Sequence, residues 1–86
     1  MNQLMPLLKS ARTNDPFLVK KMWRWEVPEV RVEVCELQEG GYEGRVQWIN
    51  NPDEGVRFTG RTFEDTVGGT EDLLVVLGFS FPKGES

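Results

Sequence analysis

The groups best suited to chemistry are carboxylates that recur along the middle of the chain. They are Glu33, Glu36, Glu39 and Glu43. Two carboxylates in a cleft can act as an acid and a base when their pKa values differ, and a fixed ladder of carboxylates around a central glycine can hold calcium. The spacing here matches neither pattern. Because charged side chains are rarely buried, we interpret these glutamates as the solvated faces of strands.

The residue inventory argues against an enzyme. The chain has no histidine and a single cysteine, Cys35. This excludes Ser-His-Asp and Cys-His nucleophilic schemes, a zinc site built from several Cys or His ligands, and an internal disulfide. The glycine pairs at 40–41 and 68–69 lack the lysine or third glycine of a phosphate-binding loop. We therefore predict no catalytic residue, no metal and no cofactor; a hydrolase or transferase would need a cleft with two convergent, perturbed carboxylates.

Aromatic and basic residues form the second candidate site. Two lysines precede Trp23, Arg24 and Trp25, and Tyr42 and Trp48 follow further along. Cations beside aromatic rings can bind nucleic acid, but tryptophan is also enriched at the centres of protein interfaces. The net charge of −4 argues against direct nucleic-acid binding. We therefore predict that these three residues, with Tyr42 and Trp48, contact a partner protein.

Hydrophobic periodicity predicts the elements that position these residues. Apolar side chains recur at helical spacing between residues 4 and 11, so a short amphipathic helix is expected over 2–12. The whole segment 1–21 is predicted to be helical or irregular. From Met22 the period changes to two, which predicts a β-meander over 22–59.

The clearest strand precedes a glycine turn. Apolar residues alternate with polar ones over 29–37, Gly40 and Gly41 supply a turn, and alternation resumes over 42–49, so this stretch predicts a β-hairpin. A polar turn cluster at 50–55 then leads to a further short strand. The expected sheet is antiparallel, with three or four strands.

One helix is expected to follow the meander and pack on the sheet. Thr62 is a good N-cap, and two carboxylates fall in the first turn, so we predict a helix over 62–77. The glycine pair at 68–69 is expected to bend or break it. A strand over 73–81 is the competing interpretation. With a flexible tail at 82–86, the chain is predicted to be a single α+β domain spanning 1–86.

Two motifs resemble the HicB antitoxin family. They are Glu39-Gly40-Gly41-Tyr42 and, after a turn cluster, Gly60-Arg61-Thr62-Phe63-Glu64-Asp65. The resemblance covers about residues 30–77 and implies a β-β-β-α fold that covers a partner protein. The chain departs from the family pattern in its longer segment between Tyr42 and Gly60 and in the absence of a C-terminal DNA-binding segment.

Two functions are carried forward from the sequence. The first is a small non-catalytic protein-binding module, an antitoxin-like inhibitor or accessory subunit in the cytoplasm. Its partner is another protein or a second copy, in a heterocomplex or a homo-oligomer. The second is an acidic mimic of nucleic acid that inhibits a phage or host enzyme. Its candidate acidic face consists of Glu33, Glu36, Glu39, Glu43, Asp53 and Glu54. No apolar run is long enough to span a membrane.

Overall fold

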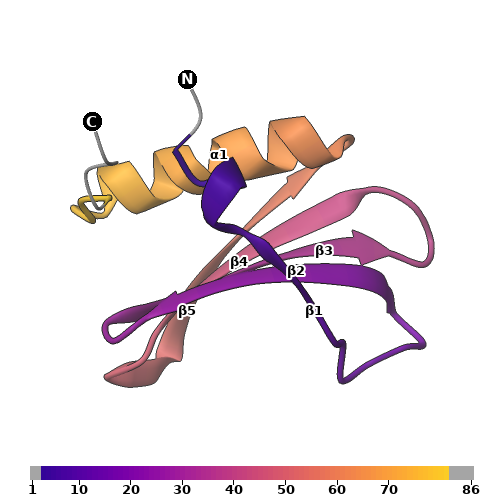
Figure 1. Ribbon diagram of the computed structural model, residues 1–86, viewed down its shortest axis with the longest axis horizontal. Helices are drawn as coiled ribbons and strands as arrows, with labels where there is room; N and C mark the ends of the chain where they lie inside the picture. Colours follow the sequence, from indigo (N-terminus) through magenta and orange to yellow (C-terminus); the bar gives the residue numbers. More distant parts are fainter. Residues whose placement is uncertain (1–2, 82–86) are drawn as a thin grey trace.

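The computed structural model describes residues 3–81, which form a five-stranded antiparallel sheet with one helix across one of its faces (Figure 1). The strands follow one another in chain order across the sheet. The predicted α+β class, the antiparallel meander and the helix packed after it are confirmed. The elements are the 3-10 turn η1 (Met5–Leu7), β1 (Lys9–Ala11), β2 (Val19–Val27), β3 (Val30–Leu37), β4 (Tyr42–Trp48), β5 (Asn51–Gly60) and α1 (Phe63–Val76). The predicted tail at 82–86 lies outside the described residues.

The sheet separates an apolar face from a charged one. In β3, the side chains of Val30, Val32 and Val34 are fully buried beneath α1. The intervening residues of β3, with their cross-strand neighbours, face the other way. We call this second face the open face, because none of the described helices or strands packs on it (Figure 1). The strict alternation of β3 therefore decides which residues reach the core.

The expected helix over 2–12 is wrong for most of its length. Only η1 is helical, and Leu8 is already extended, with φ −71° and ψ 133°. The next three residues form β1 and pair with Met22–Arg24 of β2. Pro6 has no backbone N–H to continue a helix, and the buried side chain of Leu4 fixes the turn against the core. β2 also starts earlier than predicted, at Val19 instead of Met22.

The polar cluster at 50–55 is mostly strand rather than turn. The β4–β5 connection turns at residues 49–50, since Trp48 pairs with Asn51. The next pair is Gln47 with Gly55, so residues 52–54 form a bulge opposite an uninterrupted β4. A proline in the sequence of this bulge fits the rule that proline occurs in strands at edges and irregularities.

The glycine pair does not break α1, which runs without interruption through Gly68 and Gly69. The N-cap is confirmed, because the Thr62 side chain accepts a hydrogen bond from the Asp65 amide at 3.1 Å. A Cβ on Gly69 would collide with the ring of Phe58 in β5. The glycine therefore allows helix and sheet to approach closely, and this packing outweighs its poor helix propensity.

Candidate functional site

The four predicted aromatic contacts lie on the sheet face that α1 covers. Trp23 lies 4.6 Å from Phe63 between ring centroids, and Tyr42 lies 6.0 Å from the same ring. Trp25 packs against Phe79 at 5.7 Å, and Trp48 packs partly buried against the core. These rings contribute to the layer between sheet and helix. Their predicted role as partner contacts stays a prediction that this packing does not favour.

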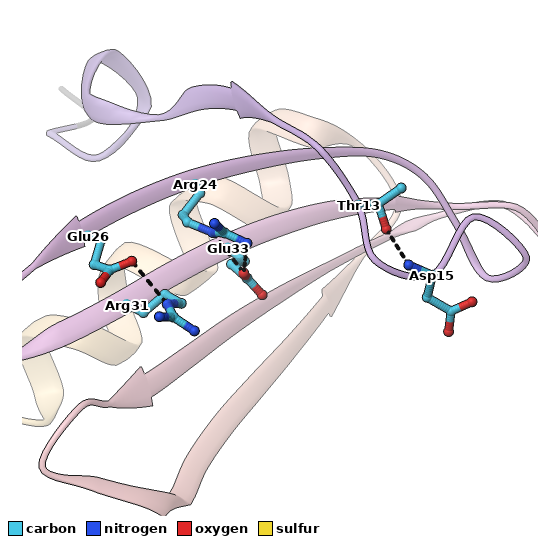
Figure 2. A network of polar contacts seen from close by, with 6 residues as sticks. All are labelled: Thr13, Asp15, Arg24, Glu26, Arg31 and Glu33. Atoms are coloured by element: carbon cyan, nitrogen blue, oxygen red, sulfur yellow. Dashed lines mark hydrogen bonds and ion pairs between the residues drawn. The ribbon is translucent and has the colours of Figure 1, made fainter.

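Arg24, the fifth residue of that set, lies on the open face instead. It pairs with Glu33 of β3, with 2.9 Å between Nη2 and a carboxylate oxygen (Figure 2). Arg31 and Glu26 pair beside them at 3.1 Å, and α1 lies behind the sheet in this view. The structure therefore separates the predicted arginine from the predicted aromatic residues by the thickness of the sheet.

The predicted acidic face does not form one surface. Glu33 and Glu43 lie on the open face, where Arg24 and Arg45 pair with them. Glu36 pairs in register with Tyr42, on the α1 side of the sheet, and Glu39 belongs to the β3–β4 turn. The other two residues, Asp53 and Glu54, are exposed in the bulge of β5. Because these carboxylates are dispersed and partly neutralised, the structure gives no support to a mimic of nucleic acid.

The cysteine is placed as a structural residue. Cys35 is fully buried on the open side of the sheet, in a small cluster with Val19 and Met22. Burial raises the pKa of its thiol, with smaller effects from the charges nearby, which is the reverse of what a nucleophilic cysteine needs. Within residues 3–81, no group of three or more Cys, Asp or Glu side chains is placed to hold a metal ion.

A broad, shallow concave surface runs between β5 and α1. This groove has a volume of about 690 Å³. Phe58 and Gly60 of β5 form one wall, and Gly68, Leu73 and Val76 of α1 form the other. The side chain of Val76 is 81% exposed. Its neighbours in the chain, Val75 and Leu77, are exposed as well, and a contiguous uncovered apolar patch is typical of a contact site.

The rim of the groove is acidic. Glu64, Asp65 and Asp72 of α1 line it together with one cation, Arg61. The sequence of α1 contains no lysine or arginine at all. The electrostatic potential along this side of the molecule is therefore negative, which favours a cationic ligand.

The groove also runs along an unpaired sheet edge. β5 is the last strand of the sheet, so its outer backbone groups have no neighbouring strand among the described elements. At the opposite edge, β1 is only three residues long. The bulge disrupts the first half of β5, but residues 55–60 pair regularly with β4 and present a straight outer edge. Such an edge is a template for another extended chain.

Sequence reasoning did not single out the groove between β5 and α1. It assigned the aromatic residues to a surface, although their alternation with charged residues is equally typical of a core face. One available signal was the apolar run Leu73–Leu77, which has more apolar residues than one buried helix face needs. Three of these side chains, Val75, Val76 and Leu77, are exposed in the structure.

Comparisons of the chain with protein-family models, with curated proteins and with solved structures find no match. The resemblance to HicB antitoxins therefore stays a prediction from the two motifs. Within the described part of the chain, no helix has the length and apolar character needed to cross a membrane.

Proposed function

We propose that the protein is a non-catalytic binding module that holds an extended, cationic segment of a partner protein in the groove between β5 and α1. In this role it acts as an inhibitor or accessory subunit in the cytoplasm. The observation that carries the proposal is the coincidence of an unpaired strand edge, an apolar groove wall and an acidic rim along one line. Strand addition to a sheet edge is an established mode of peptide recognition.

The groove specifies the chemistry of its occupant. A strand paired with residues 55–60 would lie about 4.8 Å from β5, and its alternate side chains would point toward α1. Apolar side chains at these positions would contact Leu73 and Val76, while flanking lysines or arginines would approach Asp65 and Asp72. The expected ligand is therefore an extended segment whose α1-facing positions, every second residue, are apolar at the centre and basic at both ends.

A second copy of the chain fits this groove less well. Pairing β5 with β5 of another copy would bring the acidic residues of two α1 helices toward one shared edge. Glu64, Asp65 and Asp72 of each copy would then face like charges, with only Arg61 to offset them. Like charges placed together disfavour an interface. Charge complementarity thus favours a different, basic partner.

The test is a binding titration with a synthetic peptide. The probe is a fluorescein-labelled peptide of about seven residues, Lys-Thr-Val-Thr-Val-Thr-Lys, in which the valines and lysines all fall on one face of a strand; its length covers the regular part of the β5 edge. We expect saturable binding by fluorescence anisotropy, with NMR amide shifts concentrated in 55–60 and in α1. Val76→Asp should weaken binding about tenfold or more, because burying a valine side chain contributes roughly 1.5 kcal/mol or more.

Val75→Asp is the matched control. Val75 is the neighbouring residue on α1 and is 56% exposed, but it does not line the groove. This variant should bind the peptide like the wild type. The proposal is wrong if both variants bind equally well, or if amide shifts map to another surface. A dimer in sedimentation that Val76→Asp dissociates would identify a second copy as the occupant and refute the basic partner.

A further inference from the structure

The strand register places a row of cations across the open face. Lys9 pairs with Arg24, Arg24 with Glu33, Glu33 with Arg45, and Arg45 with Arg57, so one residue from each strand lies in a single line. Four of the five are basic. With about 4.8 Å between neighbouring strands, the row extends about 19 Å across the sheet. We call it the basic row.

The outer end of the row is open to solvent. The side chain of Arg57 is 73% exposed, and its Nη1 lies 4.0 Å from Glu43. Arg45 donates from Nε to Glu43 at 2.7 Å. An arginine has five N–H donors in a planar fork, so a single such contact leaves most of them for another anion. Lys9 is exposed at the opposite end of the row, in β1.

An exposed aromatic ring stands beside the same end. Phe17 is 88% exposed, and it shares a hollow of about 340 Å³ with Arg45 and Arg57. Leu18, Leu37 and the carboxylates of Glu39 and Glu43 also line this hollow. The loop that carries Phe17 is held to the start of the β3–β4 turn. The Gln38 amide donates to the Leu18 carbonyl at 2.9 Å, and its side chain donates to the Pro16 carbonyl at 3.1 Å. The ring is thus presented to solvent on an anchored backbone.

The net charge of the chain conceals this arrangement. α1 alone carries four carboxylates and no basic residue, which equals the net charge of −4 for the whole chain. The acidic groups of α1 lie on the other side of the sheet from the basic row, whose four cations are offset by two carboxylates, Glu33 and Glu43. The expectation against direct nucleic-acid binding rested on a charge averaged over both sides. The local potential of a surface decides what binds there.

We infer that the open face binds a single-stranded nucleic acid, with phosphates along the basic row and a base stacked on Phe17. Cationic grooves combined with aromatic platforms are the usual means of holding single strands. An acidic protein surface is the other anionic candidate. It fits less well, because an exposed aromatic ring beside arginines suits a base next to its phosphate.

The test is anisotropy titration of a fluorescein-labelled oligothymidylate of about 12 nucleotides, at low salt and then at rising salt. We expect a plot of the logarithm of the binding constant against the logarithm of the salt concentration to have a slope near −2. Such a slope corresponds to about three phosphate contacts on a single strand. Arg57→Glu should weaken binding and reduce the slope by about 0.7. Phe17→Ala should weaken binding at least about fivefold and leave the slope unchanged.

Two controls locate the site. Arg61→Glu makes the same charge change at an exposed arginine beside the β5–α1 groove, and Val76→Asp disables that groove; both should retain binding. The inference is overturned if no binding is detected at low salt. It is also overturned if Arg57→Glu and Arg61→Glu lower the affinity for the oligothymidylate equally. If polyglutamate competes as well as unlabelled oligothymidylate and Phe17→Ala has no effect, the ligand is an acidic protein and the inference is wrong.

Discussion

The two adjacent glycines of α1 should respond to alanine in opposite ways. A Cβ on Gly68 meets no atom within 4 Å, whereas a Cβ on Gly69 would overlap the ring of Phe58. Replacing glycine by alanine inside a helix contributes about 0.8–1.0 kcal/mol to stability. Gly68→Ala should therefore raise the free energy of unfolding by about 1 kcal/mol, which corresponds to about 4–8 °C in Tm for a domain of this size.

Gly69→Ala has the same gain in helix propensity, but it overpacks the contact between helix and sheet. Overpacking costs typically 1–3 kcal/mol. The net effect should lie between about zero and a loss of about 2 kcal/mol in the free energy of unfolding. In a Phe58→Ala background the obstructing ring is absent, so Gly69→Ala should again stabilise the protein by about 1 kcal/mol.

The assay is urea denaturation followed by tryptophan fluorescence. The wild type, Gly69→Ala, Phe58→Ala and the double variant form one double-mutant cycle, and Gly68→Ala is measured beside it. The coupling between Gly69 and Phe58 should amount to about 1–3 kcal/mol, the size of the overpacking cost. The reasoning fails if Gly69→Ala stabilises the protein as much as Gly68→Ala does. That result would mean that α1 does not approach β5 closely at this point.

Three further substitutions test the close contacts and the buried groups. Gly44→Ala would force a Cβ against Thr70, whose own Cβ would lie 3.1 Å away; we expect urea denaturation to show a loss of about 1–3 kcal/mol. Glu71→Ala removes the carboxylate that accepts the backbone N–H of Leu4 at 3.0 Å, so we expect a loss of about 1–2 kcal/mol and faster amide exchange at Leu4. Burial raises the pKa of Cys35 above its unfolded value; stability should therefore decline as the pH rises above about 8.5, and thermal unfolding of Cys35→Ala should lack this decline.

A contrary result in any of these three experiments would contradict the contact that the substitution tests. If Gly44→Ala is as stable as the wild type, Thr70 can move aside freely and the contact does not fix the position of the helix. Unchanged exchange at Leu4 in Glu71→Ala would show that apolar burial alone holds the N-terminal turn. An equal alkaline decline in the Cys35→Ala protein would show that the decline does not come from this thiol.

The sequence predicted well wherever local chemistry and tertiary packing agree. The turn at Gly40 and Gly41 has φ angles of 108° and 80°, which glycine adopts without strain. Thr62 caps α1 as expected, and the valines of β3 form the centre of the core. In these cases one residue type satisfies both the backbone and the packing, so a short window of sequence is sufficient.

Prediction from the sequence failed where a contact between residues far apart in the chain decides the local structure. Nothing within 2–12 indicates that residues 9–11 pair with β2, because that pairing depends on an edge supplied by residues 22–24. Gly69 is read locally as a helix breaker, although Phe58 in β5 is the reason for it. The acidic candidates lie close together in sequence, but Glu33 and Glu36 are an odd number of residues apart in β3, so alternation sends them to opposite faces. Register, which the sequence leaves open, also creates the basic row.

Gly68 connects the stability of α1 with the groove beside it. The residue lines the groove, and its missing side chain leaves that space empty. A sequence selected for helix stability alone would carry alanine here, since alanine gains about 1 kcal/mol without a clash. If the groove receives a strand, a methyl group at this position narrows it, so Gly68→Ala should be the more stable protein and the weaker binder of the valine–lysine peptide. Such opposition between stability and binding is expected at functional sites. A variant that gains stability and keeps its full affinity would show that Gly68 has no part in binding.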